Sequence, residues 1–517
     1  MIMSEKADII LYNANVLTID PEIPKAKLVA IKGERIIYVG DDDKLGDLEG
    51  QKTQKIDCRG RTLIPGFNDA HCHILAFASS LLSVDCSPSV VSSVTDIKAQ
   101  IHKQAQKLTR GTWIRATGYN EFYLAEKRHP NRDDLDEAAP HHPVKLVHRS
   151  SHACVLNSIA LSLVGISNET QEPPDGMIVR DLESGEPNGL LFEMNSYIDR
   201  MIPSLSQEEL EKGIRLVNKK YLSHGITSLQ DATVNNRLVE LSALRGFRER
   251  GILVPRLSVM MGIASLGELQ DYGFSPHCGD DAVRLGALKV VLSEARGSLY
   301  PPRDEIEEKG LKAHLSGYQL AIHAVDDTTV AAAVGVLEHV QDRMQRKDHR
   351  HRIEHCSVCP PHLLKRLQNV RALVVTQPSF IYYSGERYLK TVPEDHQKWL
   401  YRIGSFFQNG LMPAAGSDSP VVPINPLLGI YAAVTRRTEH GEELLPHERV
   451  SPLVALKMYT QAAAFASFDE AVKGSITVGK IADFALLSAD PTQVSPEDIR
   501  GIGVEMTIVE GRIAWQT

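Results

Sequence analysis

The 517-residue sequence has no excess of positive charge. Its 57 Lys and Arg residues are outnumbered by 65 Asp and Glu residues, which gives a formal net charge of −8. Proteins that bind nucleic acid usually carry a basic face. The composition therefore predicts no nucleic acid partner.

Long uninterrupted apolar runs are also missing. Charged residues break the amino-terminal stretch MIMSEKADIILYNANV, so it lacks the apolar segment of a secretory signal. The best candidate for a membrane span, residues 410–434, contains four prolines and Asp418. A spanning helix needs continuous backbone hydrogen bonding. We therefore expect a cytoplasmic protein that makes no contact with a membrane.

Several motifs of other protein classes are missing. The seven cysteines are odd in number and scattered, which indicates reduced thiols in a cytosolic enzyme more than a disulfide framework. Cys356 and Cys359 form a CxxC without a second pair at zinc-ribbon spacing, and we interpret them as small buried residues. There is no GxGxxG, Walker or GxSxG sequence, so neither a nucleotide fold nor a serine hydrolase is indicated.

The two ends of the chain share a pattern of short strands and turns. KLVAIKGERIIYVGD near the start resembles VEMTIVEGRIAWQT at the end. We predict one small β-sandwich built from residues 1–63 and 474–517; two unrelated hairpins are the alternative.

Between the ends, short β-rich runs alternate with helical segments, which is the pattern of a parallel sheet with crossover helices. The candidate strands lie within residues 61–73, 225–232, 256–262, 286–293, 318–325, 351–358, 371–379 and 411–418. A (β/α)8 TIM barrel requires this number of strands, so we predict an α/β fold with such a barrel over residues 64–473. A doubly wound open sheet is the alternative, but its Gly-rich phosphate turn is missing.

One interval in this barrel is too long for a helix and its loops. The first candidate strand ends at residue 73 and the second begins at residue 225. We therefore predict a large insertion at about residues 80–215.

His71 and His73 follow the first barrel strand in the sequence PGFNDAHCH. Side chains at positions i and i+2 of a strand point the same way, so both imidazoles can reach one metal ion. Among twenty histidines a chance pair is easy to find. Its place at the carboxyl end of a strand, where barrels have their active sites, favours a metal site.

Three further strands end on residues of types that are common metal ligands in proteins: His323 in AIHAV, His355 in RIEHC and Asp418 in AAGSDSP. A single histidine at a strand end is usually structural, but several together indicate a site. For Asp418 two interpretations stand: a residue of an ordinary turn, or a metal ligand that accepts a proton from bound water.

Lys289 places a cation inside the apolar strand GALKVVLS. An unpaired buried ammonium is unfavourable, so the lysine must reach solvent, find a partner or change chemically. One alternative is a side chain that extends to solvent. The other, which we favour, is reaction with CO2 to a carbamate that bridges two metal ions.

These residues together resemble the ligand series of the amidohydrolase superfamily. RIEHC, QPSF, GSDSPVVPINPLLGIYAAVTRR and GKIADFALLSADP are similar to its YtcJ-like branch, whose characterised members include an N-substituted formamide deformylase. The resemblance extends over nearly the whole chain. It implies a hydrolase that cleaves a C–N bond of an amide, formamide or cyclic amide, with a small-molecule substrate. The oligomeric state is left open, with a homodimer as one candidate assembly.

The resemblance also implies a ligand set. His71, His73 and Asp418 would hold one divalent metal and His323 and His355 a second, with carbamylated Lys289 and a hydroxide between them. Zinc is the expected metal, although iron, manganese or nickel suit the same ligands. Asp418 would take the proton of the attacking hydroxide and deliver it to the leaving nitrogen.

Two other functions stay open. In the first, a single metal held by His71, His73, His323 and Asp418 supports deamination of a ring amidine, with His355 assisting. In the second, the same fold serves as a non-catalytic regulatory or binding protein.

Substrate contacts are expected in the insertion and after the lysine strand. TGYNE and PVKLVHRSSHACVLNSIAL also resemble the branch and point to Tyr119 and His152, although ordinary packing explains these residues equally well. After Lys289 many members have an Asp-Gly pair, whereas this chain has Glu294 and Arg296, which we expect to shape a different pocket. Arg352 and Glu354, beside His355, either orient a metal ligand or form an ordinary buried ion pair.

Overall fold

The computed structural model describes residues 6–173, 176–295 and 298–517. Contacts within the chain define two compact units. The first comprises Met1–His73, Asn218–Ser419 and Pro423–Thr517, and the second comprises Ile74–Val217 and Pro420–Val422.

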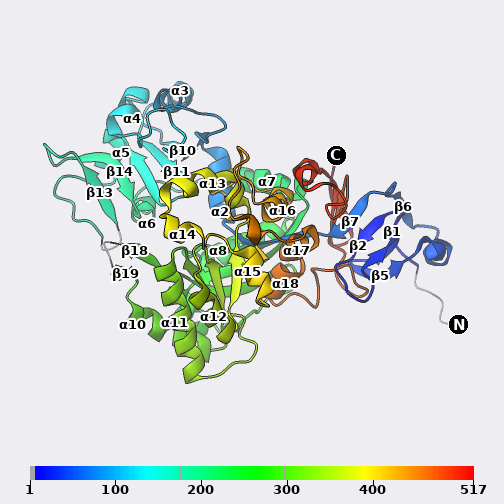
Figure 1. Cartoon of the computed structure of the whole chain (residues 1–517). Helices are drawn as coiled ribbons and strands as arrows, with labels where there is room; N and C mark the ends of the chain where they lie inside the picture. The colour runs from blue at the N-terminus through cyan, green and yellow to red at the C-terminus, as the bar shows by residue number, and fades with distance from the viewer. Residues whose placement is uncertain (1–5, 174–175, 296–297) are drawn as a thin grey trace. The chain divides into compact units, whose positions relative to one another are not determined.

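Eight parallel strands form the central sheet of the first unit (Figure 1). In spatial order they are β8 (Phe67–Cys72), β15 (Ile226–Asp231), β16 (Arg256–Gly262), β17 (Val283–Val291), β20 (Leu320–Ala324), β21 (Arg352–His355), β22 (Leu373–Thr376) and β23 (Ala414–Ala415). Two backbone hydrogen bonds tie the first strand to the segment after the last, from Asp418 N to His71 O at 2.7 Å and from His73 N to Ser419 O at 2.9 Å. The sheet is thus a nearly closed barrel, which confirms the predicted fold and excludes the open sheet.

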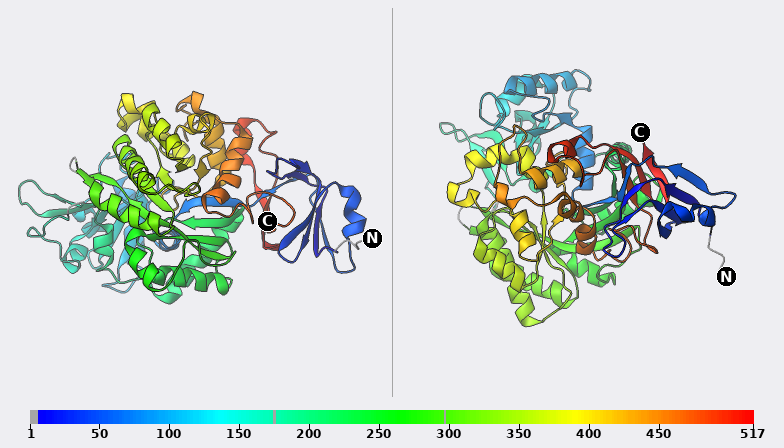
Figure 2. Two further views of the ribbon diagram at one scale, coloured as in Figure 1. Left: turned by 90° about the horizontal axis from the view of Figure 1, so that it is seen from below. Right: turned by 45° about the vertical axis from the view of Figure 1, so that its right-hand side comes forward.

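Helices cover the outer face of this sheet, as the views in Figure 2 show. They include α8 (Leu238–Glu249), α10 (Arg303–Leu315), α11 (Asp327–Arg343), α12 (Pro361–Asn369), α13 (Ser379–Thr391) and α16 (Pro426–Thr435). Every residue of β15 and β16 is buried. This is the environment of parallel strands with side chains on one face and helices on the other.

The stretch 61–73, predicted as one strand, forms two strands. β7 (Thr62–Pro65) pairs with strands from the two ends of the chain, whereas β8 begins the barrel. Gly66 separates them, and a Cβ atom at this position would lie 2.2 Å from the side chain of Thr227. Only glycine allows the backbone to pass so close to β15 at this bend.

Strands from both ends of the chain share one sheet. Its order is β26 (Arg512–Gln516), β25 (Val504–Val509), β24 (Phe484–Leu487), β7, β2 (Asn15–Leu17) and β3 (Lys25–Ala26). A second sheet has the order β5 (Arg35–Gly40), β4 (Leu28–Lys32), β1 (Ile9–Tyr12) and β6 (Gln54–Asp57). Leu11, Val16, Phe484 and Ile508 belong to one apolar core between these sheets. The buried ion pair between Arg256 Nε and Asp483, at 2.6 Å, joins this region to the barrel strand β16.

The second unit has its own sheet and core. The strand order is β13 (Met177–Arg180), β14 (Pro187–Phe192), β12 (Ala153–Leu156), β11 (Val144–His148), β10 (Ile114–Tyr119) and β9 (Val84–Asp85). Helices α3 (Val94–Ala105) and α4 (Arg132–Ala138) connect the three parallel strands. The domain limits given above for the sandwich, barrel and insertion stay predictions.

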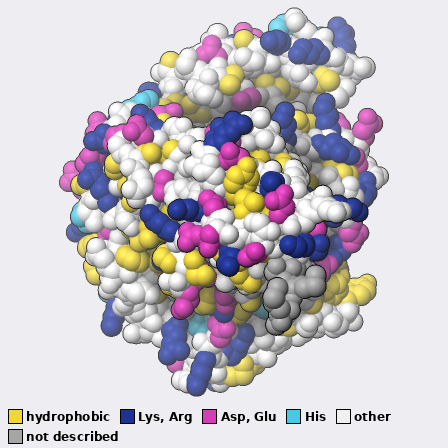
Figure 3. Space-filling model, turned by 90° about the vertical axis from the view of Figure 1, so that its right-hand side faces the viewer, with side chains coloured by type: hydrophobic (Ala, Val, Ile, Leu, Met, Phe, Trp, Pro, Cys, Tyr) yellow, Lys and Arg dark blue, Asp and Glu magenta, His cyan; other side chains and the backbone are white. Residues whose placement is uncertain are grey.

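Three further observations concern membrane spans, cysteines and surface charge. No helix in the described part of the chain is both long enough and apolar enough to span a membrane. All seven cysteines fall within the described residues and are free, and Cys356 and Cys359 are buried. On the face drawn in Figure 3, Lys and Arg side chains are interspersed with Asp and Glu.

Three buried histidines, His314, His349 and His351, form a hydrogen-bonded network near the amino ends of β20 and β21. The bonds join Leu320 N to His351 Nδ1 (2.9 Å), His351 Nε2 to His314 Nδ1 (2.8 Å), His314 Nε2 to Met344 O (2.7 Å), His351 N to His349 Nδ1 (2.9 Å) and His349 Nε2 to Val370 O (2.9 Å). Each imidazole accepts at one nitrogen and donates at the other, which requires the neutral form. Burial lowers the pKa of His349 to about 4 and that of His351 well below its usual value.

We predict that this network makes folding sensitive to acid. The unfolded chain takes up protons on these histidines near pH 6.5, whereas folded His349 resists protonation until about pH 4. The free energy of unfolding therefore falls as the pH is lowered through this window, with His349 contributing on the order of 3 kcal/mol. Urea unfolding at several pH values measures the slope. His349→Gln is expected to reduce it, with exposed His362→Gln as the control, and an unchanged slope in His349→Gln would contradict the assignment.

Candidate metal centre

His71 and His73 lie at the carboxyl end of β8 and converge on one carboxylate. His73 Nε2 is 3.0 Å and His71 Nε2 is 3.6 Å from the same oxygen of Asp418. His71 is buried and His73 is half-buried. The alternation of side chains along a strand thus brings both imidazoles to the same point, as expected for positions i and i+2.

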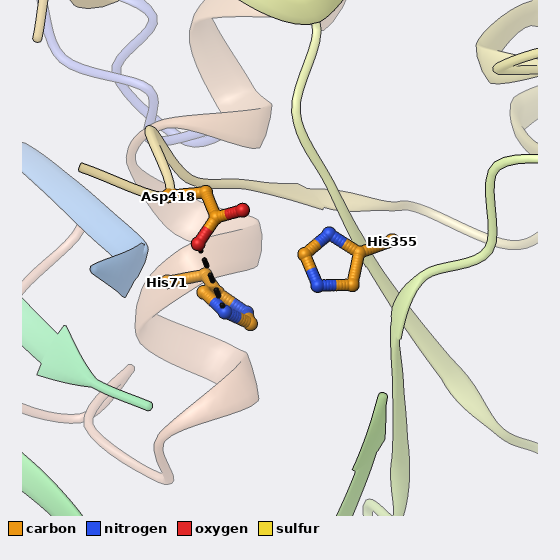
Figure 4. Close-up of side chains that lie close together, drawn as sticks. All are labelled: His71, His355 and Asp418. Carbon is orange, nitrogen blue, oxygen red and sulfur yellow. Dashed lines mark ion pairs between the residues drawn. The ribbon is translucent and has the colours of Figure 1, made fainter. Parts of the chain in front are cut away.

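His355, at the end of β21, completes a compact group. One potential ligand atom from each of His71, His355 and Asp418 lies within 4.8 Å of the others. Figure 4 shows the Asp418 carboxylate directed toward His71, with the ring of His355 nearby. Ligand atoms about 2 Å from a zinc ion lie within about 4 Å of one another, so a small adjustment of this group would form part of a coordination shell.

The three strand-end histidines around Asp418 each use Nδ1 for a hydrogen bond within the protein. The partners are the Glu354 carboxylate for His71, Thr233 Oγ1 for His73 at 2.9 Å and Gln377 Oε1 for His355 at 2.7 Å. Carboxylate and amide oxygens accept, so His71 and His355 carry their proton on Nδ1. Their Nε2 lone pairs are therefore available to a metal, and the ring orientations are fixed.

Arg352 and Glu354 form an ion pair that also supports His71. Arg352 Nε lies 2.5 Å from one oxygen of Glu354, and the other oxygen accepts from His71 Nδ1. Arg352 also donates to Gln230 Oε1 and Ala70 O, both at 2.6 Å. The two alternatives drawn from the sequence therefore describe the same contact: a buried ion pair that orients a histidine of the site.

The protonation states of the group suit a cation. Burial, then the nearby charge of Lys289, lowers the pKa of His71 to about 3. For Asp418, burial alone would raise the pKa, but the hydrogen bond from His73 and the charges of the surrounding histidines outweigh it and lower the pKa. At neutral pH the imidazole of His71 is neutral and the carboxyl of Asp418 is ionised, as ligands must be.

Lys289 is buried near the charges of Glu354 and Asp418. The residue is 2% exposed, and its buried Nζ makes no hydrogen bond to any residue in the described ranges. This burial excludes the alternative in which the side chain reaches solvent. Burial lowers the pKa of Lys289 to about 8, against the opposing charges of Glu354 and Asp418. Part of the amine is therefore uncharged near neutral pH, which is the form that reacts with CO2.

His323, at the carboxyl end of β20, lies beside the compact group without belonging to it. Its ring centroid is 4.4 Å from that of His355, and the planes are inclined by 70°. The side chain is half-buried. The structure therefore brings His323 beside His355, at the carboxyl ends of the neighbouring strands β20 and β21.

Two residues of the site have left-handed backbone conformations. The φ angles are +69° for His355 and +55° for Asp418. This conformation is disfavoured by roughly 1–2 kcal/mol for residues with a Cβ atom. Such residues persist where the surrounding structure holds them, often at functional sites, and here they turn the two side chains toward the same centre.

The four residues expected to contact substrate are not brought together by any described contact. Tyr119 is buried at the end of β10, where its hydroxyl lies 2.9 Å from His129 Nδ1. The half-exposed side chain of His152 lies 2.7 Å from Glu193. Glu294 is exposed in β18 (Ser293–Ala295), and Arg296 lies outside the described residues. Their role in substrate binding stays a prediction.

Sequence reasoning missed three polar residues that support the histidines: Gln230, Thr233 and Gln377. Gln377 follows β22 directly and Gln230 lies within β15. A polar residue at the carboxyl end of a barrel strand is the available signal. Its partner is set by the neighbouring strand, which a pattern along one segment does not reveal.

Comparisons with known proteins agree with this arrangement. The profile of the amidohydrolase family matches residues 54–514. The chain is 29% identical to the N-substituted formamide deformylase of Arthrobacter pascens over 99% of both chains. It is 26% identical to the putative amidohydrolase YtcJ of Bacillus subtilis over 98% of this chain and 99% of the relative.

Solved structures share the fold. That of an uncharacterized metal-dependent hydrolase from Pyrococcus horikoshii has a TM-score of 0.76 at 22% identity, covering 95% of this chain and 99% of the other. The similarities confirm the resemblance to the YtcJ-like branch. With the family profile matched over residues 54–514, the chain belongs to the amidohydrolase family and is a metal-dependent hydrolase that acts on carbon–nitrogen bonds.

Proposed function

We propose that the protein hydrolyses the C–N bond of a small amide, formamide or cyclic amide with two divalent metal ions. His71, His73 and Asp418 would hold one ion, and His323 and His355 the other. Zinc suits imidazole and carboxylate ligands, and iron, manganese or nickel fit as well. The buried, unpaired amine of Lys289 is the observation that carries this proposal.

A carbamate on Lys289 would remove the unfavourable burial of an amine that has no hydrogen-bond partner among the described residues. The nitrogen lone pair of the uncharged amine forms an N–C bond to CO2, one C=O π bond breaks and its electron pair moves to oxygen, and the nitrogen releases a proton to water. The product is an anionic, carboxylate-like group that can bridge two cations. It replaces an unpaired buried amine with a ligand whose charge is balanced by the metals.

The residues around this centre have distinct roles. When bound, the metal ions supply a water nucleophile at neutral pH and a Lewis acid for the substrate carbonyl. Asp418 accepts the proton of the attacking water and delivers it to the leaving nitrogen. Its low pKa and fixed backbone keep it ionised and in place before the reaction.

Substrate contacts fall to residues outside the metal centre. We propose Tyr119, His152, Glu294 and Arg296 as candidates: the first two lie in segments of the insertion that resemble the branch, and the last two follow the strand that carries Lys289. The similarity to a formamide deformylase supports small N-substituted formamides as the first compounds to assay. We propose a cytoplasmic location, which the seven free cysteines support; the homodimer stays a prediction.

Lys289→Ala is predicted to lower the metal content. We expect two ions per chain in the parent protein, more fully loaded with bicarbonate, and one or none in the variant, because the bridging carbamate is lost. Elemental analysis of the purified proteins measures this, and 13C-labelled bicarbonate reports the carbamate by NMR. Lys145→Ala, at another buried lysine, is the control. One ion per chain that is indifferent to Lys289 would favour the mononuclear deaminase-like alternative.

Asp418→Asn is predicted to retain metal but lose turnover. The amide is a weak base and accepts no proton from water, so kcat should fall by about 10²- to 10⁴-fold. Metal analysis and an amide hydrolysis assay measure the two effects separately. Asp271→Asn, on an exposed residue of α9 (Leu266–Asp271), is the matched control. Full activity in Asp418→Asn would exclude this role.

Gln377→Met is predicted to weaken metal binding through His355. A thioether is a poor acceptor for the Nδ1 proton, so the imidazole loses its fixed orientation, and the metal affinity should fall about 10- to 100-fold. Competition with a chelator measures the affinity. Gln377→Glu should restore it, and Gln270→Met on the surface is the control. An unchanged affinity in Gln377→Met would show that this hydrogen bond does not orient the ligand.

A further inference from the structure

The first unit contains a cavity at the end of the barrel opposite to the metal centre. Its volume is about 620 Å³, within the range of small-molecule sites. The walls come from the segments that precede β21, β22 and β23, together with α18 (Gln461–Ala466). None of these residues has a role in the proposed reaction.

In one wall of the cavity, Arg350 contacts two carboxylates and two aromatic rings. Its guanidinium forms ion pairs with Asp348 at 2.8 Å and Glu470 at 2.7 Å. The same group stacks on the rings of Phe465 and Phe468, at 3.7 and 4.2 Å from their centroids. Arg350 balances one of these two carboxylates, so the group carries a net charge of −1, against the +2 of Lys347 and Arg371 in the same lining.

Two other cations of the lining, unlike Arg350, have no ion-pair partner among the described residues. Lys347 and Arg371 are exposed, and no hydrogen bond or ion pair joins either side chain to another described residue. The other side of the lining is apolar and includes Leu373, Met412 and Ala462. The accessible surface of the cavity thus combines unpaired positive charge with an apolar wall.

We propose that this cavity binds a small organic carboxylate with an apolar body. The carboxylate would pair with Lys347 and Arg371, and the apolar part would lie against Leu373, Met412 and Ala462. Pairing with unengaged guanidinium or ammonium groups needs no prior ion pair to break. An organic cation of the same shape would meet like charge, so the sign of the ligand follows from the lining.

The site is independent of the metal centre. His355, Gln377 and Asp418 lie at or just beyond the carboxyl ends of β21, β22 and β23, whereas the cavity borders the amino ends of the same strands. A strand of four residues separates these ends by about 13 Å. Substitutions at the cavity therefore leave the metal ligands in place, and a carboxylate bound to metal is distinguishable from one bound here.

Calorimetric titration of the full-length, metal-loaded protein tests the proposal with hexanoate, and with hexylammonium as the matched cation. We expect saturable binding of hexanoate and binding of hexylammonium weaker by about tenfold or more. The double variant Lys347→Gln and Arg371→Asn should weaken hexanoate binding by about tenfold or more. Asn suits position 371 because φ is +53° there.

Two further variants complete the design. Met412→Trp should block hexanoate binding by filling the cavity, with an unchanged thermal unfolding midpoint as the check on folding. Lys365→Gln, on exposed Lys365 of α12 outside the lining, should leave binding unchanged. Equal binding of both ions, or hexanoate binding that persists in the double variant and in Met412→Trp, would overturn the proposal and assign the binding to another site.

Discussion

A buried chain of hydrogen bonds from Arg352 through Glu354 to His71 joins strands in the interior of the barrel. The guanidinium of Arg352 contacts its own strand, the carbonyl of Ala70 in the first strand and Gln230 in β15. Loss of one partner from a buried pair of this kind typically destabilises a protein by about 3–5 kcal/mol, because a charge is left without compensation. Here the same contacts that join three strands also fix the ring of His71 in the candidate metal centre, so one set of atoms serves both the barrel interior and the proposed site.

Much of the fold follows from patterns that are local in the sequence. The strands carry continuous apolar runs, and His71, His323 and His355 stand where those runs end, so both the barrel and the position of these side chains at its rim were predictable. The split of residues 61–73 into two strands was not, because it depends on the close approach of Gly66 to Thr227 on another strand. The limits of the domains and the roles of the site residues stay predictions.

The finer structure of the site depends on contacts between distant segments. Arg352 and Glu354 stand beside His355 in the sequence. The sequence did not show that Glu354 contacts His71, which lies on β8, a strand that is not a neighbour of β21. Nor did it show that Gln377 accepts from His355. Lys289 was different, because a lysine inside an apolar strand requires explanation in the sequence itself. In the structure its buried amine has no hydrogen-bond partner among the described residues, and the proposed carbamate rests on this observation.

The shared sheet of the two chain ends has a consequence for synthesis. β7 lies between β2 and β24, and β24 begins only at Phe484. During synthesis, one edge of β7 therefore stays unpaired until almost the entire remaining chain has been made, on the order of tens of seconds at ordinary elongation rates. During that time an unpaired strand edge is open to association with other nascent chains. Expression at low temperature or with chaperones should matter more for this protein than its final stability alone would suggest.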